Sequence, residues 1–333
     1  MPDKEGPPSF LTFARFRLYL RVQTLMVLPP YKGAVFRGAF GSSLRRLVCM
    51  TKQSDCRPCL LRERCLYVAL FEPPPPIGFT EARKFQKAPR PYVLNPPLTN
   101  RQAFRPGEVL DFELTLIGPA LDALPYFIFI FQELGRRGLG LERGKYELIK
   151  VDHLMNGSAV PIYNGRSQAF TAFTPGEGYI SASADIHLTQ ITLNFLTPLR
   201  LKEKGDLVTH LTFSRFFEHL AHRLTLLAAF YGNNSNSSAS GLGPFNFNFL
   251  LAQARHIETT NHNLHWYEWE RYSRRQDTIM KLGGLMGMIS FRGNLDPFLL
   301  YLRLGEKVNL GQGTTFGLGK FRIHTKEESH VGR

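Results

Sequence analysis

The sequence lacks the features that would place it in a membrane or outside the cell. Its longest apolar runs, such as Leu224–Phe230, fall far short of the ~20 residues that a membrane-spanning helix needs. The polar, proline-rich segment Met1–Pro8 is not followed by the apolar region of a secretion signal. Cysteine is scarce, with four residues confined to one short stretch, so a disulfide framework is not expected. We therefore expect a soluble, cytoplasmic protein with no membrane partner.

Acidic residues are also in short supply. The 333 residues include 27 Asp and Glu against 41 Lys and Arg, which gives a formal net charge of +14. Such an excess favours a polyanionic partner, with nucleic acid first and an anionic membrane surface second. The hydrophobic content of 43% excludes wholesale disorder, and the length allows two domains, each with its own core.

Both halves of the chain follow the same order of predicted elements. In the first half, strands and helices alternate over residues 10–22 (strand), 34–48 (helix), 109–118 (strand), 123–135 (helix) and 145–151 (strand). In the second half, the corresponding segments are 187–201 (strand), 213–232 (helix), 265–275 and 284–293 (strands), 294–305 (helix) and 320–324 (strand). Gly38 and Gly41 weaken the first helix, which we therefore expect to begin only near Ser42.

This repeat predicts an α+β fold made of two tandem ferredoxin-like domains. We place them at residues 1–175 and 176–333, with the boundary near 174–179. The first domain carries an insertion at 49–65 that contains the cysteines. Residues 232–241 read as a flexible low-complexity insert.

Each half contains a glycine-rich loop that closes on Gly-Lys-aromatic-x-aliphatic, at residues 144–148 and 319–323. A Walker loop requires Ser or Thr after Gly-Lys, whereas Tyr146 and Phe321 follow here, so mononucleotide binding is not expected. The loops are either tight turns or places where backbone N–H groups hold phosphate. The polar neighbours that suit a sugar-phosphate chain are Arg136, Arg137, Arg143, Lys145, Gln312 and Lys320.

The four cysteines, Cys49, Cys56, Cys59 and Cys65, follow the pattern Cys-x6-Cys-x2-Cys-x5-Cys. A pair two residues apart with two more cysteines close by is a strong signal for a metal site. Structural Zn²⁺ is the leading interpretation, and an iron–sulfur cluster with the same four ligands is the alternative. Unmetallated thiols are the third possibility.

Four stretches resemble the CRISPR-associated endoribonucleases that process precursor guide RNA, within the RAMP superfamily: residues 31–49 with the cysteine cluster, 134–148, 266–293 and 309–323. The resemblance implies two ferredoxin-like domains that bind CRISPR repeat RNA and cut once per repeat without a catalytic metal. Attack of the ribose 2′-OH on the adjacent phosphate would leave a 2′,3′-cyclic phosphate and a 5′-OH. This reaction needs a general base, a general acid and cations on the phosphate.

Related enzymes often carry a histidine near the start of the first helix, where this chain has Ser42 and Ser43. The candidate catalytic residues are therefore Tyr31 and Lys32 at the preceding turn, and His210 and His219 near the second domain's first helix. His262 and His265 are placed to flank the RNA. For each of these histidines and for Tyr31, an ordinary structural role is the alternative to a role in catalysis or RNA binding.

The candidate RNA-binding residues combine the basic and glycine-rich segments. They are Arg37, Arg45, Arg46, Arg136, Arg137, Lys145, Arg271, Arg274, Arg275, Gly311, Gln312, Gly313, Gly317, Gly319 and Lys320. Two rival hypotheses remain: a non-catalytic RNA-binding subunit of a CRISPR effector complex, and an unrelated zinc-bearing nucleic-acid-binding module. If the chain is a repeat-RNA endoribonuclease, its expected partner is precursor guide RNA, with subunits of a CRISPR effector complex as further partners.

Overall fold

The computed structural model describes residues 11–74, 88–155, 157–177, 188–232, 247–273 and 278–325. The chain divides into two compact units. An N-terminal unit contains Met1–Gly178 and Leu226–Gly241, and a C-terminal unit contains Tyr179–Thr225 and Leu242–Arg333. None of the described helices is long and apolar enough to cross a membrane. The predicted low-complexity insert at 232–241 lies, except for Gly232, outside the described residues.

The N-terminal unit is built on an antiparallel sheet whose strands have the order β3-β5-β1-β6-β7-β8. The strands of this sheet are β1 (Thr12–Val22), β3 (Tyr92–Asn95), β5 (Val109–Ile117), β6 (Tyr146–Met155), β7 (Ser158–Asn164) and β8 (Ala169–Phe170), and β9 (Gly176–Glu177) pairs with β1. The helices are α1 (Gly33–Val48), α2 (Leu66–Phe71) and α3 (Leu124–Arg137). Two short strands, β2 (Met26–Val27) and β4 (Ala103–Phe104), pair outside the main sheet.

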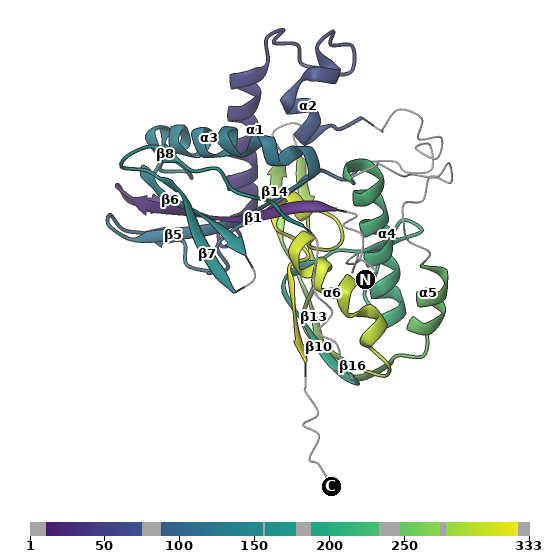
Figure 1. Ribbon diagram of the computed structural model, residues 1–333. Coiled ribbons are helices and arrows are strands. Elements are labelled where there is room, and N and C mark those ends of the chain that lie inside the picture. The colour runs from purple at the N-terminus through teal and green to yellow at the C-terminus, as the bar shows by residue number, and fades with distance from the viewer. Residues whose placement is uncertain are drawn as a thin grey trace, which may run out of the picture. The chain divides into compact units, whose positions relative to one another are not determined.

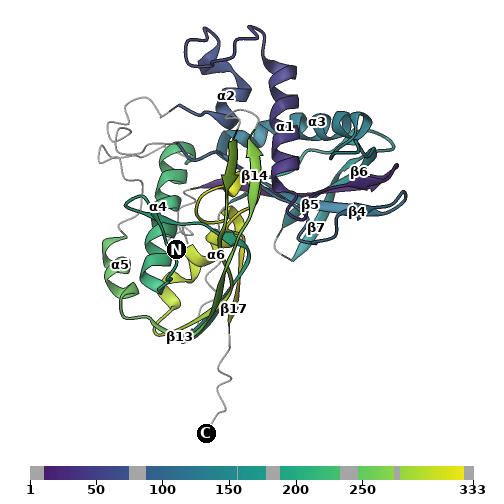
Figure 2. The ribbon, with the colours of Figure 1, turned by 180° about the vertical axis from the view of Figure 1, so that it is seen from behind.

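The C-terminal unit has a four-stranded antiparallel sheet of order β13-β16-β10-β17. Its main elements are β10 (Gln190–Leu199), α4 (Phe213–Tyr231, of which the last six residues belong to the N-terminal unit), α5 (Asn248–Ala254), β13 (Glu258–Tyr267), β16 (Gly284–Arg292), α6 (Asp296–Val308) and β17 (Phe321–Thr325). A two-stranded ribbon of β14 (Glu270–Ser273) and β15 (Thr278–Lys281) continues from β13, as Figure 2 shows.

The two sheets have equivalent topology. The order β3-β5-β1-β6 corresponds strand for strand to β13-β16-β10-β17, and in each unit a helix follows the first and the third of these strands along the chain. This is the split βαβ arrangement of a ferredoxin-like domain. The prediction of two tandem ferredoxin-like domains is therefore confirmed.

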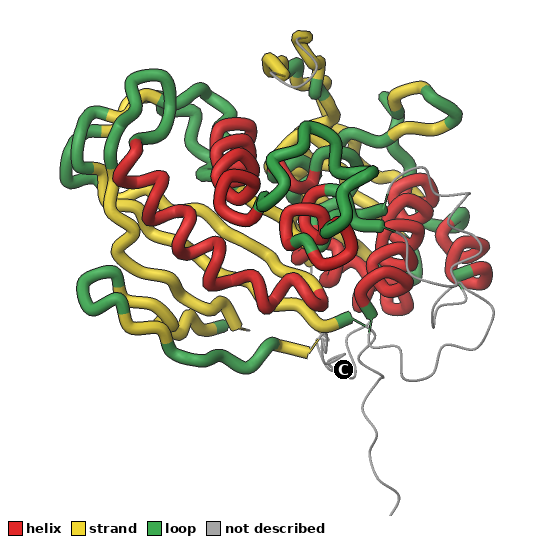
Figure 3. Tube along the Cα trace, turned by 90° about the horizontal axis from the view of Figure 1, so that it is seen from above, coloured by secondary structure: helices red, strands yellow, loops and turns green. Residues whose placement is uncertain are grey.

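Aromatic side chains fill the space between each sheet and its two helices. In the N-terminal unit, Phe40 of α1 stacks on Phe127 of α3 with ring centroids 4.0 Å apart, and Phe36 lies 5.0 Å from Phe112 of β5. Both helices therefore cover the same face of the sheet, as Figures 1 and 3 show. In the C-terminal unit, Phe216 of α4 packs on Phe321 of β17 at 5.4 Å. Burial of these large rings is the main source of stability in each core.

Helix α1 begins at Gly33, so the expectation that it would begin near Ser42 was wrong. Phe36 and Phe40 are fully buried, and their burial outweighs the low helix propensity of the glycines. Gly41 has a packing role, because a Cβ atom placed there would lie 2.7 Å from the ring of Phe71.

Two predicted helix ends, at Gly135 and at Gly305, were also wrong. Helix α3 continues past Gly135 to Arg137, and α6 continues past Gly305 to Val308. A Cβ atom on Gly135 would lie 2.2 Å from the carbonyl oxygen of Tyr146, and one on Gly305 would lie 2.8 Å from the ring of Phe321. These glycines allow close packing inside a helix and do not end it.

Tyr146 and Phe321 are the first residues of β6 and β17, and they are the aromatic residues of the repeated Gly-Lys-aromatic motif. In both units, therefore, the aromatic residue that starts the last ferredoxin strand packs against a glycine of the preceding helix. The sequence repeat marks this shared helix-to-strand contact.

Substitution of these helix glycines should separate packing from helix propensity. Gly135→Ala and Gly305→Ala should each lower the free energy of unfolding by roughly 1–3 kcal/mol, because the added methyl group has no room. Gly38→Ala is the matched control, since nothing lies within 4 Å of its Cβ position. This control should gain about 0.5–1 kcal/mol from helix propensity. Urea unfolding measures all three, and equal effects at the three sites would contradict the packing role.

Candidate nucleic-acid interface

The turn before α1 holds Tyr31 and Lys32, which the sequence analysis named as catalytic candidates. Lys32 is fully buried, and its Nζ atom donates to the carbonyl oxygens of Pro30 (3.0 Å) and Thr99 (2.6 Å). Burial lowers the pKa of its ammonium group. Tyr31 is half-buried at the same turn. The contacts of Lys32 give it a structural role in this conformation, because its ammonium group is enclosed by protein.

Two of the three arginines of α1 contact other parts of the protein, and the third is exposed. The guanidinium of Arg37 lies 4.6 Å from the centroid of the Phe71 ring. Arg45 donates to the carbonyl oxygen of Ser54 at 2.8 Å, and so connects α1 to the cysteine-containing segment that follows. Arg46 is exposed and donates to Ser43 Oγ at 3.0 Å. Of the three, Arg46 is the most accessible to an RNA phosphate.

The first glycine-rich loop is a tight hairpin with charged residues on its surface. Leu139 and Gly144 exchange two backbone hydrogen bonds of 2.9 and 3.0 Å, and the Lys145 N–H donates to Thr24 Oγ1 at 2.8 Å. These N–H groups bond within the protein, so they are not available to cradle phosphate. The exposed basic side chains here are those of Arg136, Arg137, Arg143 and Lys145, and Leu141 and Glu142 of the same loop are exposed as well.

The second glycine-rich loop is more deeply packed. The N–H groups of Gln312 and Gly319 donate to the carbonyl oxygens of Arg200 and Pro198, and the N–H of Lys320 donates to Thr197 Oγ1. Gly319 has φ of +69°, and a Cβ atom there would lie 1.6 Å from the carbonyl oxygen of Leu310. Residues 314–319 are buried, whereas Gln312 is exposed. The loop therefore serves mainly to connect α6 to β17.

The C-terminal unit brings together histidines that are distant in the sequence. His210 lies just before α4 and His262 lies on the edge strand β13, with ring centroids 5.7 Å apart and ring planes inclined by 15°. Both residues are exposed. The sequence analysis named each of them but did not predict that they would be adjacent. The separation of the two histidines in the sequence gives no sign that they are neighbours. Their contact arises because strand pairing brings β13 to the start of α4.

Charged groups surround the start of α4. Arg215 donates through Nη1 to the carbonyl oxygen of His210 at 3.1 Å, and its Nε lies 3.6 Å from a carboxylate oxygen of Glu203. The other carboxylate oxygen of Glu203 lies 3.5 Å from Nε2 of His219. His219 therefore has an acidic partner, and the His210–His262 pair has a guanidinium close to it.

The basic-aromatic segment after β13 is only partly described. The backbone of Arg271 lies in β14, which pairs with β15, while Arg274 and Arg275 lie outside the described residues. Trp266, at the end of β13, donates through Nε1 to Glu268 at 2.7 Å. Residues 258–263 of β13 are all exposed, so this edge of the sheet is open to solvent.

The cysteines lie in the connection between α1 and α2. Cys49 caps the C-terminus of α1 and Cys65 caps the N-terminus of α2, with Cys56 and Cys59 in the turn between them. All four are free thiols of intermediate exposure. Within the described part of the chain, no three His, Cys, Asp or Glu side chains already have the arrangement of a metal site.

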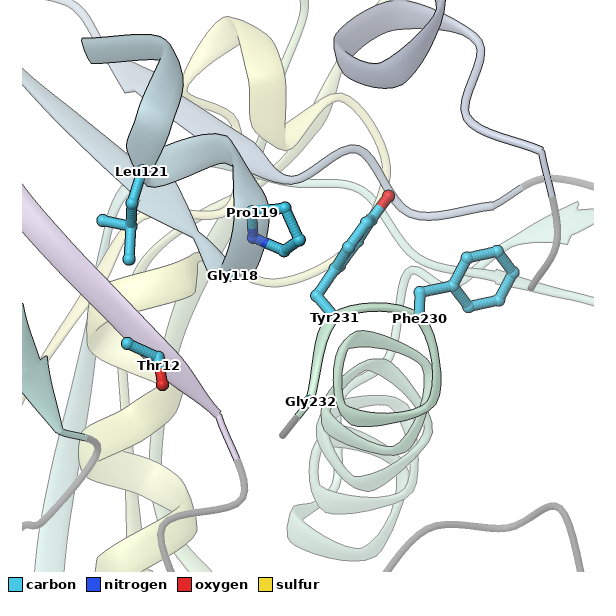
Figure 4. A pocket seen from close by; sticks show the side chains of 7 residues that line it. All are labelled: Thr12, Gly118, Pro119, Leu121, Phe230, Tyr231 and Gly232. Atoms are coloured by element: carbon cyan, nitrogen blue, oxygen red, sulfur yellow. The ribbon is translucent and has the colours of Figure 1, made fainter. Parts of the chain in front are cut away.

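A cavity of about 270 Å³ in the N-terminal unit is lined mainly by apolar groups (Figure 4). Its lining residues are Thr12, Gly118, Pro119, Leu121, Phe230, Tyr231 and Gly232. The hydroxyl of Tyr231 donates to the carbonyl oxygen of Pro89. The lining contains no histidine, carboxylate, lysine or arginine, so the cavity offers no general base for RNA cleavage.

The two units are ferredoxin-like domains, and in each a glycine-rich loop precedes the last strand of the domain. Residues 193–321 match the family model described as CRISPR-associated endoribonuclease Cas6. A second family model, described as an N-terminal domain, matches residues 11–174. The match of residues 193–321 confirms the resemblance identified in the sequence.

Individual proteins resemble this chain in sequence or in fold. An uncharacterized protein of Archaeoglobus fulgidus is 27% identical over 319 residues, which cover 95% of this chain and 98% of the relative. A Cas6 in a product complex shares the fold with a TM-score of 0.55 at 16% identity, over 94% of this chain and all of the other. The Cas6 of Thermus thermophilus has a TM-score of 0.54 at 15% identity, over 96% of this chain and all of that chain.

A larger protein contains the same fold. The matched chain of a partial Cas6-RT-Cas1–Cas2 complex has a TM-score of 0.58 at 15% identity, and the match covers 98% of this chain and 48% of the other. The present chain therefore corresponds to about half of that chain. At this level of identity the likeness concerns the fold.

The buried position of Lys32 generates a direct test of its role. Lys32→Met should lower the free energy of unfolding by about 1–3 kcal/mol, because the buried side chain would lose its charged hydrogen bonds to the carbonyl oxygens of Pro30 and Thr99. The exposed Lys202→Met is the matched control and should be nearly neutral. Urea unfolding gives the comparison. A Lys32→Met protein with unchanged stability and impaired RNA cleavage would instead identify Lys32 as a group that contacts RNA.

Proposed function

We propose that this protein is an endoribonuclease that binds CRISPR repeat RNA and cuts precursor transcripts into guide RNAs without a catalytic metal. The observation that carries the proposal is the match of residues 193–321 to the Cas6 endoribonuclease family model. The formal net charge of +14 suits a polyanionic substrate. A Cas6 of the same fold is described in a product complex, which supports RNA processing as the role of this architecture.

The reaction we propose is attack by a ribose 2′-oxygen on the adjacent phosphorus. The 2′-oxygen loses its proton to a general base, the P–O5′ bond breaks, and a general acid protonates the departing 5′-oxygen. The products are a 2′,3′-cyclic phosphate and a 5′-OH, with no net gain or loss of protons. The protein must supply an acid, a base and positive charge close to one phosphodiester.

The His210–His262 pair is our leading candidate for the acid and the base. Imidazole is the side chain best suited to proton transfer near neutral pH, and here two exposed imidazoles lie side by side. Arg215 bonds the backbone carbonyl of His210 and is the described cation attached to this end of α4. This pair offers the function of the histidine that the start of α1 lacks. His219 and Tyr31 remain the next candidates.

The RNA is proposed to run along exposed basic and polar groups in each unit. In the N-terminal unit these groups are Arg46, Arg136, Arg137 and Lys145. In the C-terminal unit they include Gln312 and the open edge of β13. Arginine side chains hold phosphates, and aromatic side chains such as Trp266 stack on unpaired bases. Association with other CRISPR proteins is a secondary proposal, which the Cas6-RT-Cas1–Cas2 complex of related fold supports.

The central experiment is cleavage of a labelled CRISPR repeat RNA by the full chain in excess EDTA. We expect one cut per repeat, and we expect a single 2′-deoxy substitution to abolish it, because the deoxyribose lacks the nucleophile. Repeat RNAs with the 2′-deoxy group at each neighbouring nucleotide are the controls and should be cut normally. Tight binding without a cut would instead indicate a non-catalytic RNA-binding subunit, and loss of cutting in EDTA would contradict metal independence.

The histidine pair is tested by substitution. His210→Ala and His262→Ala should each slow single-turnover cleavage by about 10²–10⁴-fold, the usual contribution of a general acid or base. Repeat RNA affinity should change little. His256→Ala, an exposed histidine of the same unit, is the matched control and should cut normally. Normal cleavage by both paired variants would rule out the pair and move the assignment to His219 and Tyr31.

A further inference from the structure

The segment between α1 and α2 brings four cysteine residues around one small cavity. The cavity has a volume of about 20 Å³, and Cys49, Cys56, Cys59 and Cys65 all line it. The remaining lining residues are Thr51, Gln53, Asp55, Tyr67 and Val68. A volume of this size holds about one water molecule or one metal ion. The fold thus gathers every cysteine of the protein around a space for a single ion.

The backbone of this segment is already held in a compact turn. The N–H of Cys59 lies 3.4 Å from the carbonyl oxygen of Cys56, so the Cys-x2-Cys pair forms a turn of the kind that presents two sulfurs to one ion. A 3-10 turn, Arg62–Arg64, leads into Cys65, whose N–H lies 3.4 Å from the carbonyl oxygen of Arg62. The backbone around Cys56, Cys59 and Cys65 is therefore held in defined turns.

Arg45 holds the segment against α1. Its guanidinium bonds the carbonyl oxygens of Gln53 and Ser54 and lies 5.3 Å from the centroid of the Tyr67 ring on α2. The hydroxyl of Thr51 lies 3.5 Å from the sulfur of Cys59. The four thiols therefore come from a segment that is anchored at both ends.

The charge of the segment suits an anionic metal centre. Four thiolates around Zn²⁺ carry a net charge of −2, and cationic side chains in and beside the segment offset it. These side chains are Arg45, Lys52, Arg62 and Arg64, against one carboxylate, Glu63, in the same segment. Asp55 is ion-paired with Arg57 at 2.7 Å, so these two charges compensate each other.

We propose that Cys49, Cys56, Cys59 and Cys65 bind one Zn²⁺ as a closed, structural tetrathiolate site. The ion would join the C-terminus of α1 to the N-terminus of α2, at the two residues that cap these helices. A cavity for one ion favours Zn²⁺ over an iron–sulfur cluster, which needs room for several iron and sulfide ions. Four protein ligands leave no open position, so the site takes no part in RNA cleavage.

The test is the metal content of the full-length, untagged chain. We expect one zinc per chain by elemental analysis, and loss of that zinc in Cys56→Ser and in Cys59→Ser. Leu60→Ser, a change at an exposed residue beside Cys59, is the matched control and should keep the metal. Co²⁺ in place of zinc should give the sulfur-to-cobalt charge-transfer and tetrahedral d–d absorption bands. These spectra are independent of RNA cleavage.

Limited trypsin digestion gives a second readout on the native protein. The segment contains Lys52, Arg62 and Arg64, at which trypsin can cut, whereas Pro58 protects the bond after Arg57. Zinc-loaded protein and the Leu60→Ser control should resist cutting there, and chelation should remove this protection. Absence of zinc together with failure to bind added Zn²⁺ or Co²⁺ would overturn the proposal. Iron and sulfide in place of zinc, or disulfides among the four cysteines, would overturn it as well.

Discussion

The contact between the last strand and the preceding helix is the constraint on which both halves of this protein depend. In each unit an aromatic residue, Tyr146 or Phe321, starts that strand directly against a helix glycine, Gly135 or Gly305. The loop between them must then turn so tightly that Gly319 has no space for a side chain. The strand pairs with the central strand of its sheet, β1 or β10, so its position affects the register of the whole sheet. A glycine-rich loop occurs in both halves of the sequence because both units contain this close contact between helix and strand.

The glycine-rich loops have a packing role in this structure. Several of their N–H groups bond the protein's own carbonyl and hydroxyl oxygens, so the close approach that glycine permits is between protein segments. Exposed side chains such as those of Arg137 and Lys145 lie at the borders of the first loop. In the proposed function these cations, and not the loop N–H groups, would contact the phosphates.

The ferredoxin-like fold could be predicted from the sequence because long amphipathic segments recur in the same order in both halves. The helix boundaries near glycines could not be predicted from the sequence. Gly41 and Gly305 leave room for the rings of Phe71 and Phe321, which lie far away in the sequence. The buried strand β3 was missed because four residues show too little periodicity to identify. For the site, the candidate histidines could be listed from residue type. Their adjacency could not, because it arises from strand pairing and the position of α4 on the sheet.

In the proposed function the RNA supplies its own nucleophile, and the protein supplies imidazoles and positive charge. The most direct test is mass spectrometry of the ends produced when unmodified repeat RNA is cut in the presence of EDTA. The account predicts a 2′,3′-cyclic phosphate on the upstream fragment and a 5′-OH on the downstream fragment. A 3′-OH paired with a 5′-phosphate would contradict it, because those ends arise when water or hydroxide attacks the phosphorus.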